Sequence, residues 1–355
     1  MFGRMLNVDL STGAVAWEQV PAEWVRDFIG GSGLAARLLW EELDPGRDPF
    51  DPRSPLLFIT GPLTGTGGPT PARMSLCARS PQTGLWGESN LGGFIGPELR
   101  YAGVDVLWIS GQATEPVYLW IHNGQAELRP AGHLWGSADP YETQRAIRDE
   151  VGEAQARVAS IGLAGENRVP FAGVLADHGR LAARTGMGAV MGAKRLKAVA
   201  VRGTGKVPLG DEAAFKRLRL QANKNLLEQN MTAIFKSVGT SGALDYLQMM
   251  GDMPQKYWTA ASFEGASLIS GSEMASTILT GSKACQGCVI ACGREVHVTE
   301  GPYATPPKSK GPEYETIAAL GSQLLIDDLA QITALGERCD RLGMDTISAG
   351  GAIGL

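Results

Sequence analysis

Three cysteines within eight residues carry the clearest chemical signal in the sequence. Cys285, Cys288 and Cys292 follow a C-x2-C-x3-C pattern, which lets three thiolates converge from one loop and the following helical turn, as an iron–sulfur cluster requires. Two alternatives stay open at this point: a zinc site with His297 as a fourth ligand, and three reduced cysteines that hold no metal. The total of five cysteines is odd, which favours a metal site in a reducing compartment over a disulfide framework.

A second group of segments pairs glycine-lined backbone with arginine or asparagine. These segments are residues 71–74, 88–96 and 180–192. Backbone N–H groups allow close approach to phosphate oxygens and guanidinium groups bind them in a bidentate manner, so the pattern is typical of a site for a phosphorylated cofactor. The chain has neither a P-loop pattern nor a strand–G-x-G-x-x-G–helix unit, so the common nucleotide-binding motifs are not supported.

Two carboxylates enter a predicted helix shortly after the cysteines. Glu313 and Glu315 lie in segment 310–316, where Pro312 and the acidic side chains suit the first turn of a helix and its dipole. Helix capping is therefore one interpretation. The other is that one of the carboxylates is partly buried and moves protons as a general acid–base group.

The predicted secondary structure that positions these residues changes along the chain, from mainly strands in the first part to mainly helices in the second. Up to about residue 205 the sequence predicts strands at 4–9, 56–60, 104–110 and 117–121, with a hairpin return after Asn123-Gly124. Three helices are predicted there, and the sheet is expected to be mixed or antiparallel. From residue 211 onward the spacing predicts helices at 211–230, 240–250 and 313–342, with almost no strand between them.

The sequence therefore predicts an α+β fold, with a β-sheet domain over residues 1–208 followed by a mostly helical domain over residues 209–355. The three helices expected in the first domain cover residues 21–29, 33–42 and 140–151. The last residues are small and apolar with no polar tail, which leads us to expect a chain cut within a buried element.

Composition excludes several classes of function. The 355 residues carry a formal net charge of −5 and no basic stripe, which argues against a nucleic-acid-binding protein. No apolar run approaches the roughly 18 residues of a membrane span, and we expect no membrane partner and a cytoplasmic location. Glycine accounts for 47 residues, spread among apolar segments where tight turns and close backbone approach to a ligand would use it.

Seven ordered motifs together resemble the tungsten-dependent aldehyde ferredoxin oxidoreductase family. The resemblance runs over essentially the whole chain, and its motifs lie at residues 7–13, 29–35, 59–66, 188–198, 285–292, 311–316 and 342–348.

This resemblance implies an N-terminal domain of β-sheets that forms the base for two pyranopterins chelating one tungsten or molybdenum. It further implies a 4Fe-4S cluster held by Cys285, Cys288 and Cys292, Mg²⁺ bridging the pterin phosphates, and electron transfer to ferredoxin. The catalytic group would be Glu313 or Glu315, with Glu313 favoured. The residues assigned by the resemblance to the pterins and their phosphates are Arg73, Asn90, Gly92, Gly93, Arg184, Gly186 and Asp345.

The implied activity is oxidation of aldehydes to carboxylic acids, with a homodimer or an electron-transfer subunit as the expected assembly. In the family a fourth cluster cysteine and a catalytic histidine lie in a third domain, which this sequence does not include. Three alternatives remain: a related member acting on another carbonyl compound or an aromatic thioester, a non-catalytic cofactor-binding fragment, and a radical S-adenosylmethionine enzyme. The last usually has C-x3-C-x2-C spacing, the reverse of the pattern present here.

Overall fold

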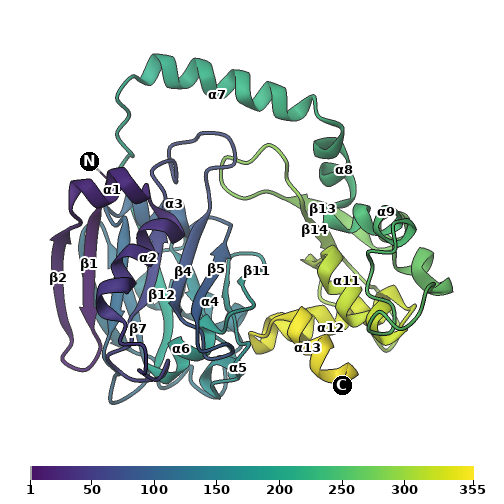
Figure 1. The fold of residues 1–355 in the computed structure, drawn as a ribbon, viewed down its shortest axis with the longest axis horizontal. Helices are drawn as coiled ribbons and strands as arrows, with labels where there is room; N and C mark the ends of the chain where they lie inside the picture. The colour runs from purple at the N-terminus through teal and green to yellow at the C-terminus, as the bar shows by residue number, and fades with distance from the viewer. Residues whose placement is uncertain (1) are drawn as a thin grey trace. The chain divides into compact units, whose positions relative to one another are not determined.

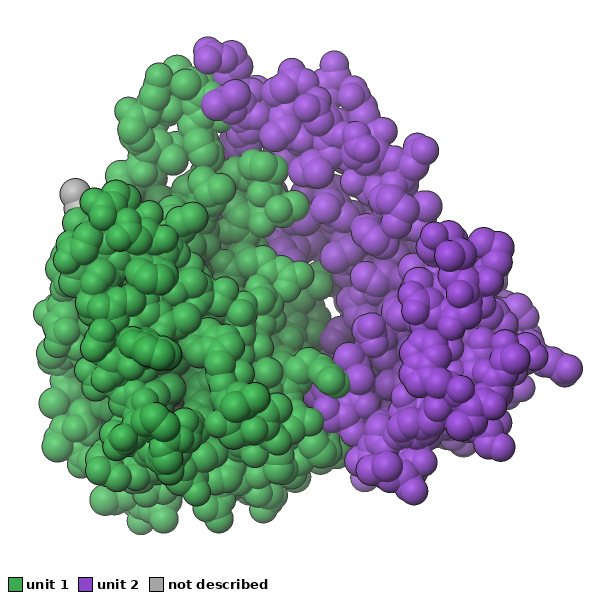
Figure 2. All heavy atoms as spheres, in the orientation of Figure 1, with its two compact units in different colours: residues 1–215, 341–344 green, residues 216–340, 345–355 purple. Residues whose placement is uncertain are grey.

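The computed structural model describes residues 2–355, which form two compact units, coloured separately in Figure 2. Unit 1 contains the residues up to 215 together with Arg341–Met344, and unit 2 contains Lys216–Asp340 and Asp345–Leu355. Sheets dominate unit 1 and helices dominate unit 2 (Figure 1). The predicted α+β class, with N-terminal β-sheets followed by a mostly helical region, is confirmed.

Two six-stranded mixed sheets build unit 1. The first sheet has the order β2-β1-β6-β3-β4-β5, and only its β1–β6 pair is parallel. Its strands are β1 (Arg4–Asp9), β2 (Ala14–Gln19), β3 (Leu56–Thr60), β4 (Met74–Arg79), β5 (Trp86–Leu91) and β6 (Val106–Ser110).

The second sheet has the order β11-β10-β9-β12-β7-β8, and only its β12–β7 pair is parallel. Its strands are β7 (Val117–His122), β8 (Gln125–Pro130), β9 (Arg157–Ser160), β10 (Val174–Ala176), β11 (Arg180–Ala182) and β12 (Leu196–Arg202). The predicted hairpin is confirmed, since Asn123 and Gly124 both adopt positive φ, 44° and 85°, between β7 and β8. A two-residue turn of this kind matches the twist of the strands it joins.

Successive side chains of a strand point to opposite faces of the sheet, and this alternation determines which side chains enter which core. Phe58 of β3 and Leu119 of β7 belong to the core shared by the two sheets, whereas Leu57 and Ile59 point to the opposite face of the first sheet. Tyr118 and Trp120 likewise face away from the shared core, under α4. The central strands of each sheet are therefore buried on both faces, which accounts for the continuous apolar run of β3, whereas the edge strands β2 and β8 are largely exposed.

Three helices of unit 1 cover the outer faces of the sheets, while α3 and α6 contribute side chains to the core between the sheets. Helices α1 and α2 pack on the first sheet and α4 packs on the second. Helix α4 begins with a capping box between Asp139 and Glu142. The six helices are α1 (Ala22–Phe28), α2 (Gly31–Glu42), α3 (Ile95–Tyr101), α4 (Pro140–Val151), α5 (Leu163–Glu166) and α6 (Met187–Ala193).

Unit 2 has its own apolar core, contributed by its helices and one strand. Its helices are α7 (Glu212–Leu227), which begins in unit 1, α8 (Asn230–Val238), η1 (Thr240–Ala243), α9 (Leu244–Met249), η2 (Glu264–Ile269), α10 (Gly271–Thr277), α11 (Tyr314–Leu320), η3 (Ser322–Leu324), α12 (Leu329–Leu342) and α13 (Thr346–Gly354). No helix among residues 2–355 has the length and apolar character needed to cross a bilayer.

Two expectations about unit 2 are wrong in detail. The helix predicted over 313–342 is interrupted after Leu320, where Gly321 leaves the helical conformation (φ −110°, ψ −92°), and Leu325 (φ 60°) then turns the chain before α12. The segment predicted to lack strands contains a three-stranded antiparallel sheet, β13 (Leu279–Lys283), β14 (Gly293–Val296) and β15 (Ser309–Lys310).

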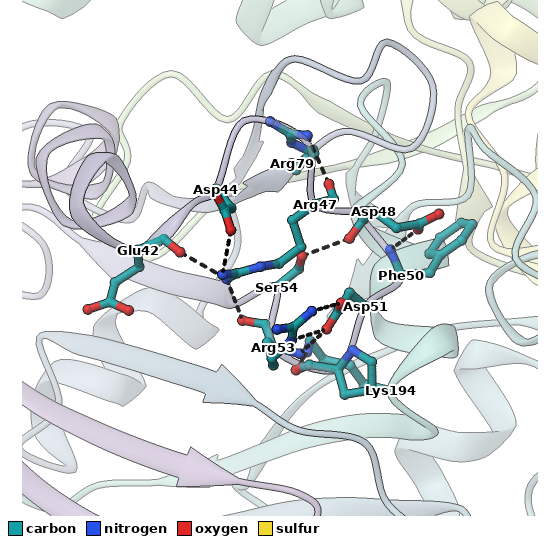
Figure 3. Close-up of polar contacts among 11 residues, drawn as sticks. Glu42, Asp44, Arg47, Asp48, Phe50, Asp51, Arg53, Ser54, Arg79 and Lys194 are labelled. Carbon is teal, nitrogen blue, oxygen red and sulfur yellow. Dashed lines mark hydrogen bonds and ion pairs between the residues drawn. The ribbon is translucent and has the colours of Figure 1, made fainter.

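A buried lysine anchors the loop that follows α2. Figure 3 shows this loop, in which Arg47 donates to the carbonyl oxygen of Glu42 (2.9 Å) and accepts at its own carbonyl from Arg79 (2.8 Å). Lys194, only 2% exposed, donates from Nζ to the carbonyl oxygens of Pro52 (3.0 Å) and Gly111 (3.1 Å). Burial lowers the pKa of Lys194 to about 8, although the carboxylates of Asp51 and Asp9 act in the opposite direction.

Substitution of Lys194 should change how stability depends on pH. Between pH 8 and 10.5 the native Lys194 has released a proton that the unfolded chain still holds, so the free energy of unfolding rises with pH in this window. Between pH 7.5 and 10 the free energy of unfolding of the parent should rise by about 2 kcal/mol relative to that of Lys194→Met. Urea unfolding measures this difference. The exposed-residue control Lys206→Met should show no such trend, and a constant difference between parent and Lys194→Met would contradict the prediction.

Candidate functional site

The glycine-rich segments 29–32 and 61–64 and the adjoining ends of β4 and β5 line a pocket of about 500 Å³ in unit 1. We call it the α2 pocket, because it lies at the N-terminus of α2. Its lining residues are Ile29, Gly30, Gly31, Ser32, Gly61, Pro62, Leu63, Thr64, Pro69, Thr70, Pro71, Arg73, Met74, Ser75, Glu88 and Asn90. It therefore brings together Arg73 and Asn90, two of the seven residues predicted to bind the cofactor.

Neighbouring strands hold these two residues in place. Asn90 of β5 pairs in register with Ser75 of β4, and its Nδ2 donates to Glu88 Oε1 at 2.9 Å. Ser75 also donates to Glu88 Oε1, at 3.3 Å. The carbonyl oxygen of Arg73 accepts from Thr64 Oγ1 at 2.8 Å. These contacts fix the backbone beside Arg73 and the orientation of the Asn90 amide.

The pocket is suited to an anionic group. Helix α2 has 12 residues, no acidic side chain in its first turn, and unpaired N–H groups at the end that opens on the pocket. The positive end of the helix dipole and the Arg73 guanidinium both favour phosphate oxygens. A side chain at Gly30 would place its Cβ 2.9 Å from Pro62 Cδ, so glycine lets the two lining segments meet.

The remaining predicted cofactor residues of unit 1 lie outside this pocket. Arg184 follows β11 in a left-handed conformation (φ 76°), and Gly92 follows β5. Packing accounts for the other two glycines: a Cβ at Gly93 would lie 2.3 Å from Asp177 Oδ2, and one at Gly186 would lie 2.1 Å from the Pro170 carbonyl oxygen.

Ser89 connects β5 to the loop that carries Arg184. Its hydroxyl donates to the Ala183 carbonyl oxygen (2.6 Å) and lies 2.9 Å from Thr185 Oγ1. Ser89 is 3% exposed, so these bonds are shielded from water. They hold the Arg184 loop against the strand that carries Asn90.

Replacing Ser89 with alanine should loosen this loop. We expect the Ser89→Ala variant to lose about 1–2 kcal/mol of unfolding free energy, because a buried carbonyl and a hydroxyl lose their partner. Urea unfolding measures the loss, and amide hydrogen exchange should speed up at residues 183–185. The exposed-residue control Ser137→Ala should stay within about 0.5 kcal/mol of the parent, and an equally small loss for Ser89→Ala would contradict the prediction.

The three predicted cluster ligands lie on one loop of unit 2, between β13 and β14. Cys285 and Cys288 are joined by a tight turn, with the Cys288 N–H donating to the Cys285 carbonyl oxygen at 3.1 Å. Gly287 and Ala291 adopt positive φ, 68° and 51°, which bends the loop between successive cysteines. All three thiols are partly exposed, and a set of three soft sulfur donors suits an iron–sulfur cluster.

Among residues 2–355, no three His, Cys, Asp or Glu side chains are gathered closely enough to hold a metal ion. The hairpin does separate the histidine of the zinc alternative from the cysteines. Cys292 immediately precedes β14 and His297 immediately follows it, which puts about 16 Å of extended chain between them. The geometry therefore does not favour His297 as a fourth ligand.

The structure distinguishes the two candidate catalytic carboxylates. Glu313, half-buried at the N-cap of α11, accepts a hydrogen bond at Oε2 from Thr240 Oγ1 (2.5 Å), and Thr240 Oγ1 in turn accepts from the Tyr314 N–H (3.0 Å). Glu315 is exposed in the first turn of α11. Burial, together with the charges of Glu315 and Asp252, raises the pKa of Tyr314 to about 12, so its hydroxyl stays neutral at physiological pH.

Asp345 is 2% exposed and caps α13. Its Oδ2 accepts from the Ser348 N–H (2.9 Å) and from Ser348 Oγ (2.6 Å). Helix capping thus accounts for much of the hydrogen bonding of this carboxylate.

Sequence analysis did not select Glu88 or Thr240. Glu88 lies in a segment that the glycine pattern had marked, but only the structure shows that it orients Asn90, two residues further along β5. Thr240 and Glu313 are 73 residues apart, and no local pattern connects them. Thr240 is the first residue of the helix predicted over 240–250, and this position indicates a helix start only.

The fold and the α2 pocket define a two-sheet α+β protein with a pocket suited to phosphate. Residues 5–203 match the family model for the aldehyde ferredoxin oxidoreductase N-terminal domain, and residues 217–355 match the model for domains 2 and 3. The chain belongs to the aldehyde ferredoxin oxidoreductase family, which confirms the resemblance seen in its motifs.

Relatives at this level of similarity include tungsten-containing aldehyde ferredoxin oxidoreductases of Thermococcus kodakarensis (41% identical) and Pyrococcus furiosus (40%), each over 353 residues. The alignments cover 99% of this chain and 57% of each relative, so the chain spans little more than half of their length. The WOR-like subunit of an aliphatic sulfonate oxidoreductase from Pyrococcus furiosus is 31% identical over 368 aligned residues, covering 99% of this chain and 58% of that subunit.

A solved structure described as the active site complex BamBC of benzoyl coenzyme A reductase, in complex with 1,5 dienoyl-CoA, is also similar. Its TM-score is 0.87 at 30% identity, covering 99% of this chain and 54% of that chain.

Proposed function

We propose that this chain is part of an oxidoreductase that oxidises aldehydes to carboxylic acids at a tungsten or molybdenum bis-pyranopterin. A 4Fe-4S cluster would pass the electrons to ferredoxin. The observation that carries the proposal is the α2 pocket, where Arg73, Asn90 and the N-terminus of α2 meet, in a chain 41% identical to a tungsten-containing relative. The reducing interior of the cell suits such cofactors, and the working form would be a homodimer or a complex with an electron-transfer subunit.

The residues of unit 1 would bind the organic part of the cofactor. Arg73 and the α2 N-terminus would take phosphate oxygens, with Mg²⁺ bridging the phosphates, and Asn90 would present its amide in the orientation set by Glu88. Arg184, Gly92, Gly93 and Gly186 would contact the pterins through the backbone of their loops. When bound, the bis-pyranopterin metal supplies the two-electron redox chemistry.

In unit 2, Cys285, Cys288 and Cys292 would be the cluster ligands, Asp345 would hydrogen-bond a pterin, and Glu313 would handle protons. Oxidation of an aldehyde with water releases two protons and two electrons, so a carboxylate acceptor is needed near the reacting carbonyl. Glu313 is the better candidate, because Thr240 holds Oε2 and leaves Oε1 to accept the proton. Glu315, exposed to solvent, lacks a comparable tether.

A related reaction is the second candidate function. The chain is 31% identical to a sulfonate oxidoreductase subunit and structurally similar to a complex of benzoyl coenzyme A reductase. These similarities support the alternative that the substrate is another carbonyl compound or an aromatic thioester. The same residues would perform the binding and proton-transfer steps in either case.

Metal analysis of the full-length protein, produced without oxygen in the presence of tungstate and molybdate, tests the cofactor assignment. We expect tungsten or molybdenum together with about four irons per chain. Arg73→Ala should lower the tungsten or molybdenum content, and Cys288→Ser should lower the iron content. A protein that contains iron but neither tungsten nor molybdenum, or that contains no metal at all, would contradict the proposal.

The two glutamates provide a matched pair for the proton-transfer role. In the metal-loaded protein, Glu313→Gln should reduce kcat for aldehyde oxidation by about 10²–10⁴-fold, while metal content and thermal unfolding stay close to the parent. Glu315→Gln should leave kcat within about threefold of the parent. Equal losses in both variants, or a larger loss for Glu315→Gln, would reverse the assignment.

A further inference from the structure

A buried arginine lies beside the loop of unit 2 that carries Cys285, Cys288 and Cys292, which we call the cysteine loop. Arg294 belongs to β14, two residues after Cys292, and is only 5% exposed. Strand β14 and the C-terminal end of α8 lie side by side, so the Arg294 guanidinium reaches this helix (Figure 1). A charged group removed from water in this way needs hydrogen-bond partners inside the protein.

Three backbone carbonyl groups bind the Arg294 guanidinium. Nη1 donates to the carbonyl oxygens of Lys236 and Ser237, each at 2.8 Å, and Nη2 donates to the carbonyl oxygen of Ala291. Lys236 and Ser237 lie in the last turn of α8, where carbonyl groups have no acceptor role within the helix itself. All three acceptors are neutral, so they hold the guanidinium in place without cancelling its charge.

The backbone of the cysteine loop packs against the same arginine. Ala291, whose carbonyl oxygen accepts from Nη2, immediately precedes Cys292 and has a positive φ of 51°. Gly239, the residue after α8, lies between the two: a Cβ at Gly239 would lie 2.9 Å from the Cys292 carbonyl oxygen and 3.1 Å from Arg294 Cγ. Arg294 is therefore tied to the cysteine loop both by a hydrogen bond and by packing.

A fixed positive charge beside a cluster changes how readily the cluster accepts an electron. Reduction adds one negative charge to an iron–sulfur cluster, and the reduction potential depends on the charges and the burial around it. A nearby positive charge stabilises the reduced state, most strongly where the protein excludes water. The carbonyl end of α8 acts in the opposite direction, because the helix dipole is negative there. Arg294, bound to two of these carbonyl groups, offsets this dipole.

We propose that Arg294 raises the reduction potential of the cluster held by the cysteine loop, by keeping a buried positive charge beside it. This inference rests on the iron–sulfur cluster of the proposed function and adds to that site a residue that is not a ligand. Removal of the charge makes the cluster harder to reduce, because the incoming electron is no longer attracted by the guanidinium. The arginine thereby favours the uptake of electrons by the cluster during substrate oxidation.

An anaerobic redox titration of the full-length protein tests the inference, with the signal of the reduced cluster followed by electron paramagnetic resonance. Arg294→Gln removes the charge and keeps a hydrogen-bond donor. It should make the cluster about tenfold harder to reduce, which is about 59 mV toward lower potential for one electron. Arg294→Lys keeps the charge and should stay within about threefold of the parent in the reduction equilibrium.

Lys236→Met is the matched control. It removes a positive charge from the same turn of α8, but the Lys236 side chain is exposed, so water and salt screen its charge. The reduction equilibrium of this variant should also stay within about threefold of the parent. Iron content and thermal unfolding are measured for every variant, so that loss of the cluster is not mistaken for a change in its potential.

Four results would overturn the proposal: an unchanged potential in Arg294→Gln, equal shifts in Arg294→Gln and Arg294→Lys, an equal shift in Lys236→Met, or loss of iron from Arg294→Gln. The last result would make the arginine a structural support of the loop. The parent protein distinguishes this failure from failure of the proposed function. A parent without iron contradicts the proposed function, whereas a parent with a reducible cluster and variants of unchanged potential contradict only the role of Arg294.

Discussion

Burial of the central strands of the first sheet on both faces is the constraint on which the rest of unit 1 depends. Its inner face shares a core with the second sheet, and its outer face requires the apolar side of α2. Once Leu34, Leu38 and Leu39 are packed on the strands, the direction of α2 is fixed. The N-terminal end of the helix then opens on the α2 pocket.

The same packing explains why the N-terminal end of α2 suits an anion. Free N–H groups at this end and the Arg73 guanidinium both line the α2 pocket. One packed helix thus organises the candidate site of unit 1. Unit 2 relies on a different device, a short polar chain from the Tyr314 N–H through Thr240 to Glu313.

Much of the fold could be predicted because it is encoded locally. The bounds of β1, β3 and α4 agree with the predicted ranges, since alternation, a buried apolar run and a capping box are all short-range signals. The break after Leu320 could not be predicted, because it depends on packing: a Cβ at Gly321 would lie 2.8 Å from Ile332 Cδ1 and 3.0 Å from Ile269 Cδ1. The short strands β13–β15 carry little apolar alternation and form only by pairing with one another.

The candidate site, like the fold, could be predicted from the sequence only in part. Motifs pointed to Arg73 and Asn90, while the roles of Ser89 and Thr240 became visible only through contacts between distant segments. The central claim is that the α2 pocket holds cofactor phosphate. An anaerobic crystal structure of the full-length protein, grown with tungstate supplied, tests it most directly. Phosphate density against Arg73 and the first turn of α2 is the predicted result, and tungsten bound in the crystal with the α2 pocket filled only by solvent would contradict it.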